Sequence, residues 1–492
     1  MKQHKKTKTR IDENTLIAGQ IERFAPLLNS SEHQALLEII HKPLLPAIRF
    51  NPLKSDDSII SVLSNNYGWT FLPVPYCSRG FRVQTNSGPL PSETVEYKNG
   101  YYYIQEASSM LPVELFSFSE TPNALTLDLA ASPGGKTTHL VSRMEDTGLI
   151  LANDSSQGRL QALKIVLQQW GATNTAVTRF PGESFGSWFP ETFDRVLIDA
   201  PCSMQGLRTS ESHPPRPVTE KETKNLARRQ SDLLSSAIRA TRIGGEIVYS
   251  TCTLAPEENE EVVESILSRF KDLVDLEDAQ RILPIPAPGI SSTNKIELRR
   301  TIRFWPHQYD TAGFFACILK KTGSIGLNSK DPPSHSMEKA GFIEVTPTEA
   351  DQFCQKFESV YGYPMRMYIR DNDRILIHRD NKFFIFPRLL LDRFPTLPVQ
   401  YAGLQVCTIT GDGVSPTFEW ASRFGTKCKH SQISLSGMEL VEWQKGNDIP
   451  FGSHRINSNT DIYIVLDEKD RFRGRGKLNQ GNLKNLDYRH YL

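Results

Sequence analysis

Residues 125–138 read LTLDLAASPGGKTT, an apolar run that ends in an acid and then passes through a turn of small residues. Leucines alternate around Asp128, which predicts a strand buried on both faces. Pro133 and the two glycines after it predict a sharp turn, and we expect a helix to begin near Lys136. Glycines let a ligand approach the backbone, and a helix N-terminus attracts negative charge, so the stretch indicates a nucleotide site.

Two nucleotide interpretations compete for this turn. A phosphate-binding P-loop would need a glycine five residues before Gly135, but Ala130 stands there. The spacing therefore excludes the P-loop. The turn of a doubly wound methyltransferase that binds S-adenosylmethionine (SAM) stays open, as does a strand–helix turn that binds nothing.

Length and composition limit the class of protein. The chain has 492 residues, 38% of them hydrophobic and 23% charged, which is typical of a globular protein of two to four domains. It contains no apolar run of about 18 residues, and no apolar segment follows the opening MKQHKKTKTR. We therefore expect a cytoplasmic protein without a membrane partner. A net charge of +1 does not itself indicate nucleic acid, so contacts with a polyanion must come from local basic patches.

The cysteines do not form a recognisable framework. They are odd in number and scattered without a CxxC pair, which argues against both disulfides and a zinc site. No metal is expected. The seven are Cys77, Cys202, Cys252, Cys317, Cys354, Cys407 and Cys428.

Downstream of residue 138, strand and helix patterns alternate, as a parallel sheet with crossover helices requires. The expected strands span residues 149–154, 175–180, 193–201, 246–253 and 314–319. The expected helices span residues 159–170, 219–242 and 256–270. Gly244 and Gly245 are expected to close the second helix.

The flanking parts carry different patterns. Before the sheet, helical spacing covers 16–40 and 59–67, and a strand pair ends at 101–104. After it, a Gly/Ser/Pro-rich linker at 323–336 precedes a helix at 348–361, a hairpin at 374–386 and strands at 404–409 and 462–466. We expect domains at 1–97, 98–322, 338–400 and 401–492, with a linker at 323–337.

Two basic segments could contact a polyanion. The first is the opening, with Lys2, Lys5, Lys6, Lys8 and Arg10, which is either a basic arm or a solvated tail. The second, DRFRGRGKLNQGNLKN, interleaves Arg471, Arg473, Arg475 and Lys477 with Phe472. An RNA-facing tail and an ordinary soluble terminus both fit this second pattern.

Polar side chains cluster at the ends of the expected strands, where open α/β sheets bind ligands. Asp154 ends the second strand and suits the two ribose hydroxyls of an adenosyl group, although it could also cap the next helix. Asp199 and Cys202 end the fourth strand, and Cys252 ends the fifth. If these two strands are neighbours, they lie about 4.8 Å apart and both thiols face one cleft.

A single cysteine in an apolar strand is usually a small core residue. Two at matching strand ends fit a particular chemistry, because methylating a pyrimidine carbon requires a nucleophile that adds at C6 and makes C5 electron-rich. A thiolate suits this reversible addition. Asp199 could interact with N3 of the ring as negative charge develops there.

Five segments carry a resemblance to a known family: YIQEASSM, LDLAASPGGKTTHL, VLIDAPCS, YSTCTLAPEENE and FWPHQYDTAGFFACILKK. Over residues 101–321 the chain resembles RNA cytosine-5 methyltransferases of the NOL/NOP/Sun class. DNA cytosine methyltransferases use the cysteine after proline and lack the second thiol, so DNA is not expected as a partner. An adenine methyltransferase would instead show a DPPY-like strand end.

The resemblance implies a fold and a set of roles. The fold is α/β, a Rossmann-like SAM-dependent methyltransferase sheet, with a small α+β N-terminal domain and a C-terminal α+β and PUA-like β-rich extension. SAM is the implied cofactor, Cys252 is implied to attack C6, and Cys202 to help release the product. The residues implied to line the SAM and base pocket are Ala130, Ala131, Ser132, Pro133, Gly134, Gly135, Lys136, Asp154 and Asp199.

The chain departs from the family pattern at three places. Ser132 stands where alanine is frequent, and Pro181 lies where an aspartate often faces the adenine. Residues 204–217 also lack the expected glycine-rich continuation.

The C-terminal extension is similar in arrangement to bacterial small-subunit ribosomal RNA cytosine-5 methyltransferases, in segments such as VQYAGL. We therefore predict small-subunit ribosomal RNA as the partner of a monomeric enzyme. Transfer RNA, an unrelated oligomerisation module, and an inactive RNA-binding assembly factor stay as alternatives.

Overall fold

The structure is a computed structural model of the whole chain. It describes residues 19, 21–118, 123–206, 208, 216–290, 296–326, 329–411, 413–451, 460 and 462–487. The basic opening segment, residues 1–18, and most of 204–217 lie outside these ranges. Within them, no helix combines the length and the apolar character that crossing a membrane would take.

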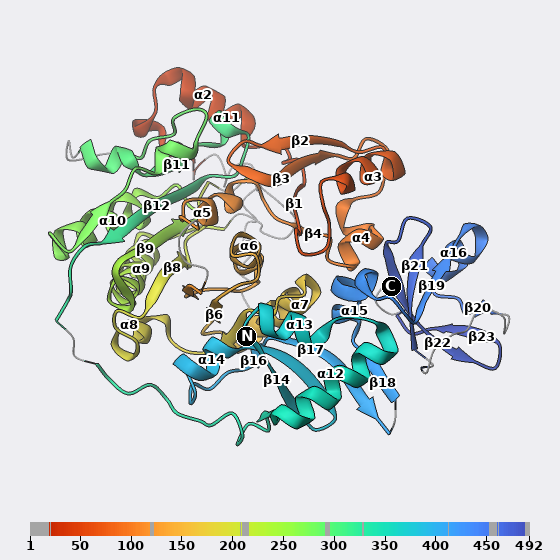
Figure 1. The fold of residues 1–492 in the computed structure, drawn as a ribbon. Coiled ribbons are helices and arrows are strands. Elements are labelled where there is room, and N and C mark those ends of the chain that lie inside the picture. Colours follow the sequence, from red (N-terminus) through yellow and green to blue (C-terminus); the bar gives the residue numbers. More distant parts are fainter. Residues whose placement is uncertain are drawn as a thin grey trace, which may run out of the picture.

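A mixed sheet of nine strands forms the centre of the molecule (Figure 1). Its order is β10-β12-β9-β8-β5-β6-β7-β16, and β11 pairs with β12. Neighbours among β5 to β9 are parallel, whereas β12 runs antiparallel to β9. The strands are β5 Leu125–Asp128, β6 Leu149–Asn153, β7 Thr175–Thr178, β8 Phe193–Asp199, β9 Thr241–Thr251, β10 Val274–Leu276, β11 Ile302–Phe304, β12 Phe314–Lys321 and β16 Tyr401–Ala402.

The chain reverses its direction across the sheet between β5 and β8. It runs outward from β5 to β7 on one side and then returns to β8 on the other. The carboxyl ends of β5 and β8 therefore flank a switch point, where ligands bind in open α/β sheets.

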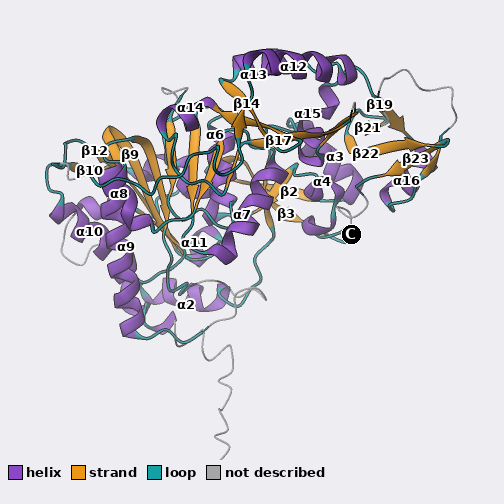
Figure 2. Cartoon of the chain, turned by 90° about the horizontal axis from the view of Figure 1, so that it is seen from below, coloured by secondary structure: helices purple, strands orange, loops and turns teal. Residues whose placement is uncertain are grey.

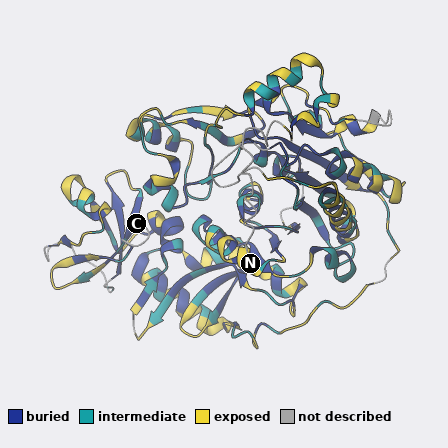
Figure 3. Cartoon of the chain, turned by 180° about the vertical axis from the view of Figure 1, so that it is seen from behind, coloured by how far each residue is buried: buried dark blue, intermediate teal, exposed yellow. Residues whose placement is uncertain are grey.

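Helices bury both faces of this sheet, whose strands are largely dark blue, the colour of buried residues, in Figure 3. One face packs Leu127 and Ile198 against Leu234, and the other packs Leu197 and Val248 with Leu140. The helices of this region are α6 Gly135–Arg143, α7 Gln157–Trp170, α8 Phe185–Trp188, α9 Glu220–Ala240, α10 Glu260–Arg269 and α11 Pro306–Tyr309.

The expected end of α9 is wrong. The helix ends at Ala240, and β9 already begins at Thr241, whose backbone is extended (φ −76°, ψ 136°). Gly244 and Gly245 therefore lie inside the strand. A Cβ on Gly245 would come within 2.6 Å of Thr241 Cγ2, so close approach of the backbone explains this glycine, and helix termination does not.

The acidic helix after Pro256 is interrupted. A short 3-10 turn, Pro256–Glu258, precedes α10, and Asn259 between them leaves the helical region (φ −115°, ψ −99°). Its side chain donates to the Thr253 carbonyl at 2.8 Å and accepts from Thr251 Oγ1 at 2.5 Å. The break thus ties α10 to the end of β9.

An antiparallel sheet of order β2-β3-β1-β4 forms the N-terminal part. Because β4 pairs with β1, this sheet extends past Tyr97. Its strands are β1 Ala47–Phe50, β2 Thr70–Val74, β3 Cys77–Gln84 and β4 Tyr102–Ile104. The helices of this part are α2 Ser30–Ile39, α3 Ser58–Tyr67, α4 Val95–Lys98 and α5 Leu111–Glu114.

Two five-stranded sheets form the C-terminal part, of orders β13-β14-β15-β17-β18 and β19-β21-β22-β23-β20. The expected hairpin is confirmed as β14 and β15, with Asp380 at its turn (φ 54°). The strands are β13 Ile343–Glu344, β14 Arg374–Arg379, β15 Lys382–Pro387, β17 Leu404–Thr410, β18 Gly413–Pro416, β19 Gln432–Leu435, β20 Ile449–Pro450, β21 Ile462–Asp467, β22 Phe472–Asn479 and β23 Asn482–Asn485. The helices are α12 Pro347–Tyr361, α13 Met365–Asp371, α14 Arg388–Arg393, α15 Phe418–Phe424 and α16 Gly437–Gln444.

This C-terminal part packs directly on the central sheet, beside which it lies in Figure 2. Strand β16 pairs with β7, and the ring of Phe394 stacks on Phe193 at 5.9 Å. The buried Asp146 also receives Arg423 at 2.6 Å. The sequence pattern shows none of these contacts, because their members are far apart in the chain.

The arginines of the C-terminal segment 470–485 form ion pairs within the fold. Arg471 and Arg473 both pair with the buried Asp467, at 2.7 and 2.8 Å. Arg473 also reaches Glu96 at 3.3 Å, which joins the last sheet to the N-terminal part. These cations are therefore used inside the fold.

Candidate active site

The two strand-end thiols lie side by side. In the parallel pair β8–β9, Asp199 is opposite Ser250, so Cys202 and Cys252 follow at matching depth. Their Sγ atoms are 3.0 Å apart, and both side chains are half-buried. The two thiols are therefore adjacent, as expected if β8 and β9 are neighbours, and the cleft that they would share stays a prediction.

Glu258 fixes the loop that carries Cys202. Its carboxylate accepts from the Ser203 backbone N–H at 3.0 Å and from Gln230 Nε2 at 2.8 Å. Ser203 Oγ lies 3.1 Å from Thr253 Oγ1, so the two cysteine loops are bonded to each other. Burial raises the pKa of Glu258.

Arg303 fixes the loop that carries Cys252. Its Nη1 donates to the Leu254 carbonyl at 2.8 Å, and its Nε donates to Glu260 Oε1, also at 2.8 Å. The Arg303 side chain is fully buried and that of Glu260 is 4% exposed. Bidentate pairing makes this arginine a rigid support for the end of β9.

Asp199 is held from both sides at the switch point. Lys136 Nζ lies 2.6 Å from its Oδ2, and Ser250 Oγ donates to its Oδ1 at 2.8 Å. Lys136 also donates to Ser109 Oγ at 2.8 Å. These bonds link the turn after β5 to the ends of β8 and β9.

The turn after β5 fits an adenosyl cofactor. Gly134 has φ +117°, and a Cβ there would come within 2.9 Å of Val166. The N-terminal amides of α6 have no side-chain cap and so can receive a carboxylate. Asp128 Oδ2 accepts from Thr137 at 2.7 Å, while its buried Oδ1 makes no hydrogen bond within the described residues.

Asp154 orders this turn and is not the N-cap of α7, which is Ser156. Its Oδ2 accepts from the Ser132 N–H at 3.3 Å, and its Oδ1 from the Ser156 N–H at 2.8 Å. Arg159 lies 3.5 Å from the same carboxylate and donates to the Ser132 carbonyl.

The loop after β7 lacks the acid that often faces the adenine. Asn153 bonds both backbone groups of Phe180, which sets the course of the chain into Pro181. The nearby Glu183 lies 3.3 Å from Arg229 of α9.

The fold thus brings the predicted residues together at one edge of the sheet. Ala130 to Lys136 follow β5, Asp154 follows β6, Asp199 and Cys202 follow β8, and Cys252 follows β9. Sequence reasoning missed Ser109, Glu258 and Arg303. The first two lie in the quoted segments YIQEASSM and YSTCTLAPEENE, whereas Arg303 carries no local signal.

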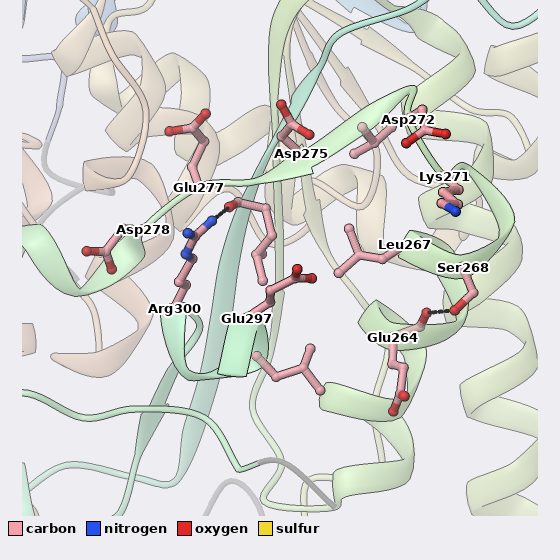
Figure 4. A pocket seen from close by; sticks show the side chains of 13 residues that line it. Glu264, Leu267, Ser268, Lys271, Asp272, Asp275, Glu277, Asp278, Glu297 and Arg300 are labelled. Atoms are coloured by element: carbon pink, nitrogen blue, oxygen red, sulfur yellow. Dashed lines mark hydrogen bonds between the residues drawn. The ribbon is translucent and has the colours of Figure 1, made fainter. Parts of the chain in front are cut away.

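A separate cavity of about 1060 Å³ lies beside the edge strand β10 (Figure 4). Six carboxylate residues and two cationic ones line it, so it repels a polyanion. The charged residues are Glu264, Asp272, Asp275, Glu277, Asp278, Glu297, Lys271 and Arg300. We therefore do not assign this cavity to the nucleic-acid substrate.

The sheet and its switch-point turn define a SAM-dependent methyltransferase with two thiols at its strand ends. A family model for 16S rRNA methyltransferase RsmB/F matches residues 117–320, and one for the N-terminal domain of 16S rRNA methyltransferase RsmF matches residues 19–107. The chain belongs to the family of ribosomal RNA small subunit methyltransferase F. The expected resemblance to the NOL/NOP/Sun class is confirmed.

Relatives and a solved structure set the extent of this similarity. The Shewanella loihica ribosomal RNA small subunit methyltransferase F is 32% identical over 86% of this chain and 85% of its own length. The Aeromonas salmonicida protein of that name is 33% identical over 83% of each chain. A methyltransferase homologue from Pyrococcus horikoshii aligns with a TM-score of 0.51 and 29% identity, covering 62% of this chain and 99% of that one.

Proposed function

We propose that the protein methylates C5 of a cytosine in small-subunit ribosomal RNA through a covalent bond between Cys252 Sγ and C6. The observation that carries this is the pair of thiols 3.0 Å apart at the ends of β8 and β9. One thiol can add to the ring while the other acts on the adduct, and methylation of a nitrogen or a hydroxyl would need neither.

The surroundings of the two thiols support different roles. The hydrogen bond to Cys252 and its own burial raise the pKa of Cys202 well above the ordinary thiol value. Cys252 is proposed as the nucleophile, and Cys202 as the thiol that assists release. After the methyl group reaches C5, loss of the C5 proton and cleavage of the S–C6 bond release the product, a step in which Cys202 assists.

Asp199 is proposed to contact N3 of the cytosine. Lys136 and Ser250 each hold one oxygen of its carboxylate, so its orientation is fixed before the base arrives. SAM, held by residues 130–136 and Asp154, supplies the methyl group. The base must leave any duplex, because attack on C6 requires access to the ring face.

The flanking parts are proposed to hold the RNA. Residues 98–322 would carry catalysis, and the N-terminal domain 1–97 and the PUA-like module 401–492 would bind RNA, joined by the linker 323–337 and the subdomain 338–400. Under this proposal the protein acts as a cytoplasmic monomer, with neither DNA nor a membrane as partner.

Two single variants test the assignment of the thiols. Cys252→Ala should lose methyl transfer, because nothing activates C5. Cys202→Ala should accumulate a protein–RNA complex that survives denaturing electrophoresis, since addition proceeds and release stalls. The matched control is Cys317→Ala, a buried thiol on β12, which should keep activity. If Cys252→Ala traps RNA instead, the roles are reversed, and if both variants stay active the mechanism is wrong.

Bisulfite sequencing of total RNA from a strain lacking the gene tests the substrate. The proposal expects loss of a cytosine mark in small-subunit ribosomal RNA. Loss in transfer RNA alone would replace the substrate and keep the chemistry, whereas no loss together with defective subunits would favour an assembly factor.

A further inference from the structure

A second cluster of reactive side chains lies away from the active-site thiols. Cys77 begins β3, Glu114 ends α5 and His139 lies in α6, so three separate elements contribute one side chain each. Cys77 and His139 are each 2% exposed, and the Glu114 side chain is 10% exposed. The proposed mechanism uses none of the three.

Their donor atoms converge on one point. One donor atom from each residue lies within 4.8 Å of the other two. Cys77 Sγ is 3.9 Å from His139 Nε2, and that nitrogen is 2.9 Å from Glu114 Oε1. Ligand atoms of a tetrahedral zinc ion lie about 3.3–3.5 Å apart. The sulfur would therefore move closer to Nε2 and Glu114 Oε1 would move away from it, each by about 0.5 Å, and the sulfur–carboxylate distance, which is at most 4.8 Å, would have to reach the same range.

The chemistry of the donors selects the kind of ion. A thiolate, an imidazole and a carboxylate together suit zinc, whereas magnesium and calcium prefer oxygen ligands alone. His139 Nε2 lies 2.9 Å from the Glu114 carboxylate, and Nδ1 makes no hydrogen bond within the described residues. An ion bound at Nε2 would replace the proton there and leave the ring proton on Nδ1.

Arg49, Arg79 and Arg143 line the cavity beside the cluster, and Arg143 pairs with one of its members, Glu114. Arg49 donates to the Gly135 carbonyl at 2.9 Å and to Thr138 Oγ1 at 2.8 Å. Arg143 Nε lies 3.5 Å from Glu114 Oε2, the oxygen that the ion would not need. Bound as thiolate and carboxylate, Cys77 and Glu114 would neutralise a divalent ion.

We propose that Cys77, Glu114 and His139 bind one Zn²⁺ ion, with water at the fourth position. A cavity of about 390 Å³, lined by Glu114 and His139, supplies the space for that water. The ion would join β3 of the N-terminal sheet to α6, the helix that follows the SAM turn. The ion would lie apart from the strand-end thiols and leave them free.

Metal analysis of the untagged full-length protein, grown with zinc and dialysed, tests this site. The expected content is about one zinc per chain, lost in Cys77→Ser and His139→Gln. Replacement by Co²⁺ should give a thiolate-to-cobalt charge-transfer band that Cys77→Ser abolishes. Cys428→Ser, which removes another buried free thiol, is the matched control and should keep both signals.

The double variant Cys202→Ala/Cys252→Ala excludes binding at the other thiol pair. If this double variant loses its zinc while Cys77→Ser keeps it, the proposal is overturned. So would wild-type protein that holds no zinc and gives no cobalt band, a result that does not depend on any variant folding. The readout is metal content, so failure leaves the proposed methyl transfer untouched.

Discussion

The thiol pair at the strand ends and the single thiol of Cys77 share their chemistry and differ in access. Cys202 and Cys252 follow parallel strands at the switch-point edge and are half-buried. Cys77 lies where the N-terminal sheet meets α6, with its side chain enclosed beside Glu114 and His139. The residue type is shared and the position differs: under the two proposals above, the accessible pair carries the chemistry and the enclosed cysteine binds a metal ion.

The largest effect is expected at an accessible group. Asp199→Asn should lower the methyl-transfer rate about 10²–10⁴-fold, because the carboxylate proposed to contact N3 of the base is lost. Unfolding by urea should change little, since the Asp199 side chain is 33% exposed. Initial rates with labelled SAM measure the first quantity. Asp194→Asn, at the opposite end of the same strand, is the control and should keep its rate.

Comparable methyl-transfer rates for the two aspartate variants would contradict this prediction. The position of Asp199 at the site end of β8 would then give it no greater effect on the reaction than Asp194 has at the other end.

Removing the buried Arg303, which supports the loop that carries Cys252, should lower stability. Arg303→Met leaves Glu260 buried without its partner and should cost about 3–5 kcal/mol of unfolding free energy. Urea titration measures this cost. The control Arg229→Met removes an exposed pair with Glu183 and should cost less than about 1 kcal/mol. Equal losses of unfolding free energy in the two variants would mean that the burial of Arg303 does not increase its contribution to stability.

A buried acid next to the site should make stability depend on pH. Burial, with a smaller contribution from Asp199, raises the pKa of Asp128 from 3.8 to about 7. Between those values the folded state holds a proton that the unfolded state has lost, so stability falls as pH rises from about 4 to 7 and is level above. The fall attributable to this residue is about 4 kcal/mol at most.

Asp128→Asn should flatten that fall, because the amide does not titrate and can still accept from Thr137. Unfolding free energies at several pH values between 4.5 and 7.5 check this. An unchanged slope in the variant would show that other groups set it.

The same contrast explains what the sequence could predict. The residues at this edge of the sheet could be predicted because the turn after β5 and each of the two cysteine segments is a short, unbroken stretch of sequence at the end of a strand. The Cys77 cluster escaped, since its members stand at 77, 114 and 139 with no spacing rule. The sequence left the role of the tail arginines open, because charge alone does not show that Asp467 and Glu96 fold against them. The predicted helix end at Gly244 and Gly245 was wrong because glycine is found where backbones approach closely as well as at helix ends.

The smallest effect is expected at Ser132, inside the SAM turn. Its backbone donates to Asp154 and accepts from Arg159, whereas its buried Oγ has no hydrogen-bond partner within the described residues. Ser132→Ala removes only that hydroxyl, so stability should stay level or rise by about 1 kcal/mol. SAM affinity measured by calorimetry should change less than about threefold, an energy below one hydrogen bond. A loss of SAM affinity of tenfold or more would mean that the cofactor is the hydrogen-bond partner of Ser132 Oγ. Ser132 would then count among the residues that contact a ligand.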